Sequence, residues 1–230
     1  MHKRVLTLLI SIALLLGLII VADFALALPP IPRLKNYEFI QDFVGGVNLK
    51  DARICRRYVQ ASNCSSKTVF SDFKDCVKSV LTKHPVCKQS LAFFHLTGGG
   101  VLKSIRRYHN IDVILADYVY IADQGTGYYI ITKSGEYLTL PINVSREALK
   151  AAPGYNMIAR KYPRVELWQI LHFPTAKRLP HHRYRLIFTQ QLKNGCNACA
   201  LAGRAKVAYD FTNNGLKFSN VKILRLIPKR

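Results

Sequence analysis

The sequence predicts an α+β fold in which a small disulfide-bearing helical unit is followed by a mostly antiparallel β-sheet. Between residues 45 and 97, apolar side chains recur at helical spacing among four cysteines. A triple glycine at positions 98–100 then marks a boundary. From residue 101 to residue 230, β-branched and aromatic residues alternate with polar ones, which is the pattern of strands. Helices followed by strands favour this class over repeated β-α-β units.

Three helices are expected before the triple glycine. The first covers Leu49–Ala61, because Asn48 is suited to cap its amino terminus. The second covers residues 68–83, where apolar side chains repeat every three or four positions. The third begins at Pro85, since proline is favoured in the first turn of a helix, and ends at the glycines.

After the glycines, the sequence predicts strands that are joined by short turns. The expected strands are 112–121, 127–132, 136–142, 164–173, 182–192, 205–211 and 216–226. A short helix over 145–151 interrupts this series and ends at Pro153-Gly154. The last two strands are expected to form a hairpin through Asn213-Asn214-Gly215, because Asn-Gly is a strong hairpin signal.

Residues 1–27 have the three parts of a secretory signal peptide. Basic Lys3-Arg4 precedes an apolar run over residues 5–22, and Ala25-Leu26-Ala27 supplies the small residues of a cleavage site. We therefore predict export to the periplasm or out of the cell, with cleavage after Ala27. Because the apolar run is nearly long enough to span a bilayer, an uncleaved amino-terminal anchor is the alternative. Residues 28–44 should form an extended, proline-rich lead-in, and no stable membrane span is expected after cleavage.

The cysteines of the helical unit are predicted to be structural. Export leads to an oxidising compartment, where an even number of cysteines favours disulfides. If the first helix and the 76–87 segment are antiparallel, the expected pairing is nested: Cys55 with Cys87 and Cys64 with Cys76. A zinc site would need closely spaced pairs of cysteines, which this unit lacks.

A second kind of cysteine motif, Cys196-Asn197-Ala198-Cys199, is compatible with a redox dithiol, half of a zinc site or a local disulfide. A predicted strand follows it, so the helix amino terminus that activates a catalytic thiol is missing. No second CxxC completes a zinc site, and the nearby histidines are His181 and His182. We interpret the pair as a disulfide that closes a loop between two strands.

The chain is strongly basic, with 34 Lys and Arg residues, 13 Asp and Glu residues and a formal net charge of +21. Since 50% of the residues are hydrophobic, this charge should lie on a folded surface, where it attracts polyanions. The densest basic stretch runs from residue 160 to residue 185 and contains Glu166 as its one acidic residue. Its basic residues, which are the candidate anion-binding residues, are Arg160, Lys161, Arg164, Lys177, Arg178, Arg183 and Arg185.

No motif is specific enough to name a reaction, and the sequence resembles no family that would supply one. The prediction is an exported, non-catalytic, basic protein that binds an anionic polymer or an acidic protein. No catalytic residue, metal or small-molecule cofactor is assigned. Two alternatives stay open. One is a thiol–disulfide oxidoreductase that uses Cys196 and Cys199, and the other is a basic secreted hydrolase or nuclease that uses His172, His181 or His182.

Overall fold

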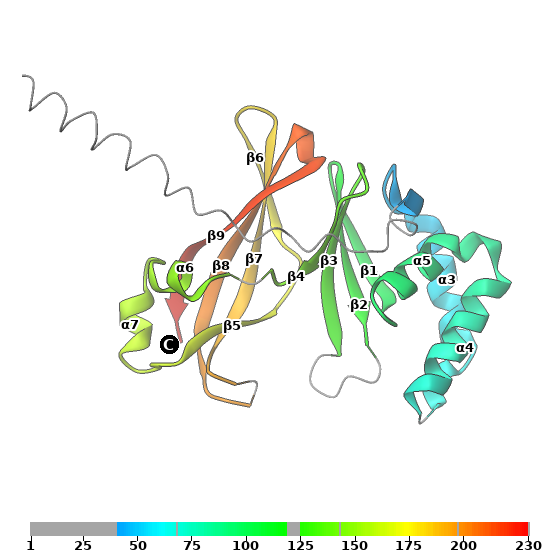
Figure 1. Cartoon of the computed structure of the whole chain (residues 1–230), viewed down its shortest axis with the longest axis horizontal. Helices are drawn as coiled ribbons and strands as arrows, with labels where there is room; N and C mark the ends of the chain where they lie inside the picture. The colour runs from blue at the N-terminus through cyan, green and yellow to red at the C-terminus, as the bar shows by residue number, and fades with distance from the viewer. Residues whose placement is uncertain (1–40, 68, 119–124, 143, 197, 230) are drawn as a thin grey trace, which may run out of the picture. The chain divides into compact units, whose positions relative to one another are not determined.

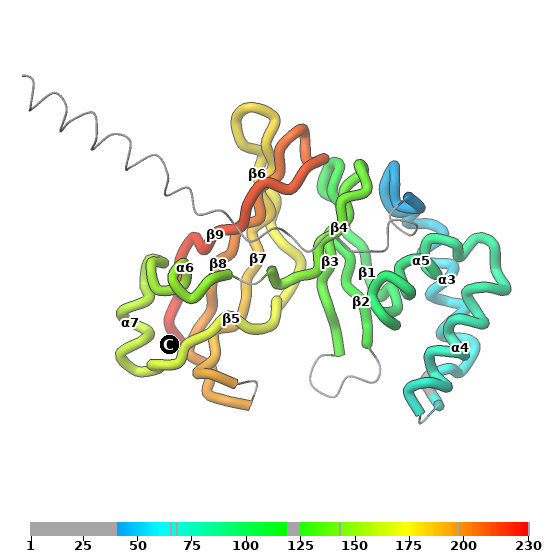
Figure 2. The backbone as a smooth tube through the Cα atoms, in the orientation of Figure 1, coloured from blue at the N-terminus to red at the C-terminus, as the bar shows by residue number. Residues whose placement is uncertain are grey.

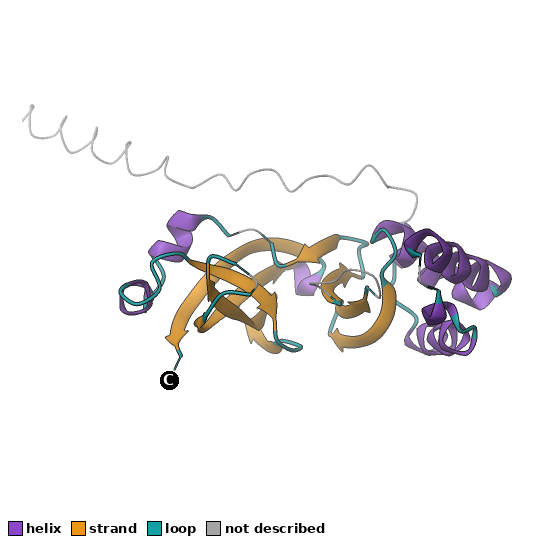
Figure 3. Ribbon diagram, turned by 90° about the horizontal axis from the view of Figure 1, so that it is seen from below, coloured by secondary structure: helices purple, strands orange, loops and turns teal. Residues whose placement is uncertain are grey.

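The protein is described from a computed structural model, which defines residues 41–67, 69–118, 125–142, 144–196 and 198–229. The predicted signal peptide and most of the proline-rich lead-in lie outside these residues. Within them, a helical part precedes two antiparallel β-sheets, so the predicted α+β class is confirmed (Figure 1). Figure 3 shows the same separation by colour, with the strands gathered apart from the helices α3, α4 and α5. Within the described residues, no helix is both long enough and apolar enough to cross a membrane.

The helical part follows the predicted limits closely. A 3-10 turn, η1 (Gln41–Phe43), comes first and buries Phe43, so the end of the predicted extended lead-in is folded. The first helix begins after Asn48, whose side chain accepts hydrogen bonds from two backbone amides of the first turn. The elements that follow are α3 (Leu49–Ala61), η2 (Cys64–Ser66), α4 (Phe70–Lys83), η3 (Pro85–Cys87) and α5 (Lys88–Leu96).

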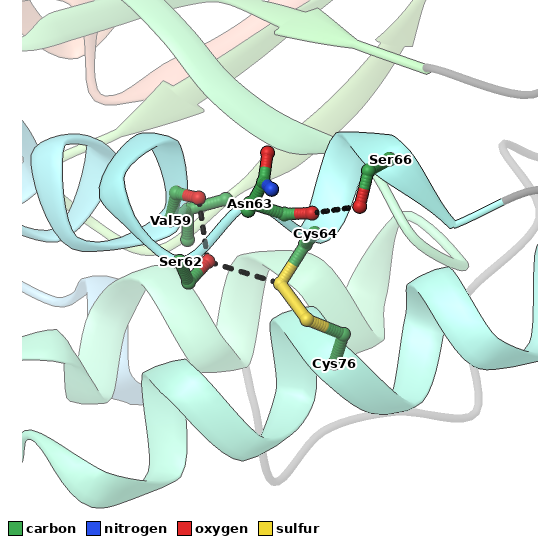
Figure 4. Close-up of a disulfide and its surroundings, with 6 residues drawn as sticks. All are labelled: Val59, Ser62, Asn63, Cys64, Ser66 and Cys76. Atoms are coloured by element: carbon green, nitrogen blue, oxygen red, sulfur yellow. Dashed lines mark hydrogen bonds between the residues drawn. A yellow bond between two sulfur atoms is a disulfide. The ribbon is translucent and has the colours of Figure 1, made fainter.

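Two disulfides hold these elements together in the nested pattern that was predicted. Cys55–Cys87 joins α3 to η3, and Cys64–Cys76 joins η2 to α4. Figure 4 shows the second bridge, with the Ser62 hydroxyl 3.0 Å from the sulfur of Cys64. The cystine sulfurs are packed with Phe73 and other apolar side chains of α4 and α5 in a small core. The disulfides are therefore part of the apolar interior of this region.

The first sheet packs against the helices on one face and against the second sheet on the other. It has the order β1-β2-β3-β4, formed by β1 (Val101–Tyr108), β2 (Ile111–Asp117), β3 (Thr126–Thr132) and β4 (Tyr137–Leu140). One face packs on the helices, for example Tyr129 against Phe93, and the other packs on the second sheet, for example Tyr128 against Phe188. The strand predicted over 112–121 ends at Asp117, and residues 119–121 lie outside the described residues. β1 is a strand that the sequence pattern did not predict.

The second sheet is built around one long strand. Its strands are β5 (Val165–Ile170), β6 (Thr175–Leu179), β7 (Arg183–Asn194), β8 (Leu201–Thr212) and β9 (Lys217–Pro228). β7 pairs with β8 along one edge, and along the other it pairs with β6 in its first half and β5 in its second half (Figure 2). The short helices α6 (Arg146–Lys150) and α7 (Tyr155–Ala159) add Leu149 and Ile158 to the core of this sheet. The strand residues predicted to make one sheet therefore make two.

Polar contacts join the turns of the two sheets. Asn110, in the β1–β2 turn, donates a hydrogen bond from its side chain to the carbonyl of Asn214 at 3.0 Å. The carboxylate of Glu136 accepts a 2.6 Å hydrogen bond from the backbone amide of Phe218 on β9. The turn between β8 and β9 is therefore held by residues of the first sheet.

Candidate anion-binding surface

One face of the second sheet collects basic side chains from four strands. Because directly opposite residues of antiparallel strands point to the same side, the register defines this face. Away from the β6–β7 and β8–β9 turns, its rows are Lys177–Arg185–Asp210, Ile187–Ala208–Lys222, Thr189–Lys206–Arg225, Gln191–Arg204 and Glu166–Lys193. At the turns, Arg183 and Lys217 lie on the same side of the sheet, opposite Leu179 and Thr212. We call the five rows away from the turns the basic face, and their basic residues are Lys177, Arg185, Lys193, Arg204, Lys206, Lys222 and Arg225. The acidic strand residues on it are Glu166 and Asp210.

The packing of the core leaves this face to the solvent. The alternate residues of β7, among them Leu186, Phe188 and Leu192, are fully buried on the opposite side. Most side chains of β7 thus alternate between an apolar inner side and a polar outer side, with buried Gln190 on the inner side and Ile187 on the outer side as exceptions. Four long side chains of the basic face are exposed: those of Lys177, Arg204, Lys222 and Arg225.

A buried carboxylate organises the centre of the basic face. Asp210 accepts hydrogen bonds from Nε of Arg185 at 2.6 Å and from Nη2 of the same residue at 2.8 Å, and its side chain is 7% exposed. This two-point contact fixes the plane of the guanidinium. The hydrogen bond to Asp210 raises the pKa of Arg185 above its usual value. Lys222 adds a longer contact, with its nitrogen 3.7 Å from Oδ2 of Asp210, the oxygen that also accepts from Nη2 of Arg185. Asp210 therefore neutralises the charge of Arg185 and fixes the position of its guanidinium on the basic face.

The other basic side chains are steadied by polar or aromatic neighbours. Lys206 donates a hydrogen bond to the hydroxyl of Thr189 at 2.7 Å. Lys193 lies over the ring of Trp168, 5.7 Å from its centre, which is a cation–π contact. Trp168 is the only aromatic residue among the described strand residues of this face. The face thus offers positive charge and hydrogen-bond donors over a wide area, with little surface for stacking.

The structure divides the basic stretch that the sequence singled out. Lys177 and Arg185 lie on the basic face, whereas Arg178 is opposite Tyr184 and so points to the other side of the sheet. Arg183 points to the same side as Arg185 but lies beyond the rows of the basic face, at the hairpin end, where its Nε donates to the carbonyl of Pro180 at 3.3 Å. The stretch 160–185 is therefore not a single patch.

The remaining three residues of that stretch lie at the far end of β7. Arg160 follows α7, Lys161 lies near the ring of Tyr162, and the backbone amide of Arg164 donates to the side chain of Asn194 at 3.0 Å. Asn194 is the last residue of β7, and Arg183 is the first. At about 3.4 Å per residue, nearly the whole length of β7 separates the two ends of the stretch.

Five residues of the basic face were missed because they come later in the chain. These residues are Lys193, Arg204, Lys206, Lys222 and Arg225. The sequence signal that could have found some of them is strand alternation. Arg204, Lys206 and Asp210 occupy alternate positions of β8, beside buried Ala205, Val207 and Tyr209. If residues 204–210 are interpreted as a strand, strand alternation alone puts these three charged side chains on one face.

Cys196 and Cys199 form a disulfide in the loop between β7 and β8, with their Cα atoms 5.0 Å apart. β8 begins at Leu201, so a strand follows the pair, and no helix begins there to lower a thiol pKa. The disulfide state matches the interpretation of a closed loop, while redox activity stays a hypothesis.

The candidate histidines are exposed in turns. His181 and His182 lie between β6 and β7 with positive φ angles of 57° and 54°, and His172 lies between β5 and β6. Among the described residues, no group of three or more His, Cys, Asp or Glu side chains is arranged to hold a metal ion. The contacts of these histidines in the described part of the chain include no pairing of a nucleophile with a base that would support the hydrolase alternative.

Comparison of the chain with protein-family models, with curated proteins and with solved structures finds no match. The three disulfides indicate an extracellular or otherwise oxidising environment. The function must be argued from the basic face itself.

Proposed function

We propose that this protein is exported and binds an anionic polymer on the basic face without catalysing a reaction. The observation that carries the proposal is the register of the second sheet, which gathers basic residues from four strands around the pair of Arg185 and Asp210. The disulfides support a place of action in an oxidising compartment.

The geometry of a sheet suits a ligand with repeated negative charges. Neighbouring strands are about 4.8 Å apart, and residues on the same face of one strand are about 7 Å apart. Basic side chains on such a lattice present many shallow contacts and no enclosed site. A polymer of phosphate, sulfate or carboxylate groups can occupy several of these contacts at once, whereas a small anion occupies one.

Because aromatic residues are scarce on the basic face, we expect it to recognise the charges of the polymer and not its bases or rings. Proteins that read single-stranded nucleic acids stack bases on several aromatic side chains, and here Trp168 already carries Lys193 over its ring. Binding through charge releases counterions, so the affinity should fall steeply as salt concentration rises.

The test uses two variants that each remove three positive charges from the surface. The first, Arg204→Gln/Lys222→Gln/Arg225→Gln, alters the basic face. The second, Arg160→Gln/Lys161→Gln/Arg178→Gln, alters residues of the predicted basic stretch that lie elsewhere. We expect the first variant to bind heparin at least about tenfold more weakly at about 0.15 M salt, with a flatter salt dependence. The second should lose less than about twofold.

Equal losses from the two variants would show that binding depends on diffuse net charge and would refute a localised face. If the first variant kept its full affinity, the localised face would also be refuted, because its exposed charges would then contribute nothing to binding. Urea unfolding of both variants provides the control for folding, because surface substitutions of this kind change stability by less than about 0.5 kcal/mol.

A further inference from the structure

A groove follows the line between helix α3 and strand β1, away from the basic face. One cavity of about 140 Å³ lies between Leu49–Arg56 of α3 and Leu102–Ile105 of β1. A second, of about 120 Å³, continues along the same helix to Gln60 and also borders Phe73 and Asp117. Both are lined by Arg56 and Leu102. We call these two cavities together the α3–β1 groove.

One wall of the groove is a sheet edge. Among the described strands, β1 pairs with β2 alone, so its other edge has no partner strand. The pairing is irregular between Leu102 and Ser104, and the backbone carbonyl of Lys103 accepts a 2.6 Å hydrogen bond from Nη1 of Arg56. A side chain of the helix thus satisfies a carbonyl that a neighbouring strand would otherwise satisfy. Such an edge can accept an extended peptide as an additional strand.

The lining of the groove combines an apolar floor with positive charge. The floor of the first cavity is formed by Leu49, Ala52, Leu102 and Ile105. Its volume is close to that of an engineered protein cavity that holds benzene, at roughly 150 Å³, and so suits one apolar side chain. The charged side chains at this cavity are Arg53, Arg56 and Lys103.

The charges are unequally available to a ligand. Lys103 forms an ion pair with Asp117, with 2.8 Å between the nitrogen and the oxygen. Arg56 donates a hydrogen bond to the carbonyl of Lys103, which is a neutral acceptor. Arg53, one turn before it on α3, is exposed. The guanidinium groups of Arg53 and Arg56 therefore favour carboxylates in the ligand.

We propose that the α3–β1 groove binds an extended acidic segment of a partner protein, which adds to the edge of β1. Alternate apolar side chains of the segment would fill the cavities, and carboxylates between them would meet Arg53 and Arg56. The stretch of α3 from Leu49 to Gln60 is about 17 Å long, which matches about five extended residues. This site lies on different elements from the basic face and does not depend on the function proposed for that face.

The experiment measures the binding of a fluorescein-labelled peptide that alternates glutamate and valine over about nine residues. The protein is the exported, disulfide-bonded chain. We expect Arg53→Glu to weaken binding at least about tenfold, because the reversed charge repels the peptide. The matched control is Arg57→Glu, an exposed residue of the same helix that does not line either cavity; it should change binding less than about twofold.

A second peptide, in which proline replaces the central valine, tests strand addition. Proline lacks the amide hydrogen that pairs with an edge strand, so this peptide should bind at least about tenfold more weakly. Absence of saturable binding, equal effects of the two arginine variants, or equal affinities of the two peptides would each overturn the proposal.

The basic-face variant separates this proposal from the proposed function. Arg204→Gln/Lys222→Gln/Arg225→Gln should bind the glutamate–valine peptide as tightly as the unaltered protein does. If it loses the peptide together with heparin, the peptide is bound as a polyanion on the basic face, and the groove proposal is wrong. If it keeps heparin and the peptide, the proposed function fails and the groove proposal stands.

Discussion

The helical part and the second sheet reach stability by different means. Three helices of nine to fourteen residues surround a small core in which two disulfides contact apolar side chains. The second sheet instead buries large side chains of its two long central strands, among them Phe188 of β7 and Tyr209 of β8, and Leu226 of β9 joins the same core. It also contains a largely buried ion pair, and its disulfide, Cys196–Cys199, closes only a short loop between neighbouring strands. The comparison teaches that the helical part, which has little apolar area to bury, depends on covalent bonds. The second sheet, which buries more apolar area, depends on strand pairing and core packing.

Loss of Cys55–Cys87 should have the largest effect on stability. This bridge closes a loop with a sequence separation of 32, and in the loop-entropy picture it contributes about 4 kcal/mol. We expect Cys55→Ala/Cys87→Ala to lower the free energy of unfolding by about that amount. In urea, far-ultraviolet circular dichroism should report loss of the helices at a lower concentration than Trp168 fluorescence reports loss of the second sheet.

The control for this prediction is the disulfide of the second sheet. Cys196–Cys199 has a sequence separation of 3, so its removal should cost about 2 kcal/mol by the same relation. If Cys196→Ala/Cys199→Ala is as harmful as the helical variant, the contrast between covalent and non-covalent support is wrong.

The second prediction compares the ion pairs of the two sheets. Asp210→Asn leaves the guanidinium of Arg185, which is 18% exposed, without its countercharge, and should cost about 3 kcal/mol. Asp117→Asn removes the partner of Lys103 in the first sheet, where the two side chains are 34% and 41% exposed, and should cost less than about 1 kcal/mol. Chemical denaturation of both variants decides the matter, and similar costs would contradict a special role for Asp210.

The smallest effect concerns pH and the helical part. Burial lowers the pKa of His95, and the charges of Lys78 and Lys74 lower it further. The unfolded chain therefore takes up a proton more readily than the folded chain does, and stability should fall as pH drops below about 6.5. The urea midpoint of the helical signal should decrease on acidification, and His95→Asn should reduce that decrease. If the urea midpoint of His95→Asn falls on acidification as much as that of the unaltered protein, titration of other groups causes the fall.

The helices and their disulfides were predictable because their signals are local. The cap at Asn48, the helical spacing of apolar residues and the antiparallel arrangement of short helices were sufficient to predict the nested bridges. Strand β1 was missed because its pairing shifts between Leu102 and Ser104, so that buried residues do not alternate regularly. β6 was missed because Thr175–Lys177 and Arg178 are exposed, so the strand has no apolar face.

The candidate site was less predictable, because its residues meet through strand register. Lys177 and Arg225 belong to one face although 48 positions separate them in the chain. Two irregularities in the pairing of β8 with β9, next to Lys206 and Asp210, decide which residues of β9 lie opposite them. Counting charges along the chain therefore found Lys177 and Arg185 but assigned Arg178 to the same surface.

The contacts around the turn between β8 and β9 have a consequence for the order of folding. Each sheet pairs mainly neighbouring strands, so its hydrogen bonds close short loops. The bonds between the sheets join residues 104 positions apart for Asn110 and Asn214, and 82 apart for Glu136 and Phe218. Closing such long loops costs more chain entropy before any contact is gained. Formation of the two sheets should therefore precede their docking, and the rate of folding should be governed by that late, long-range closure.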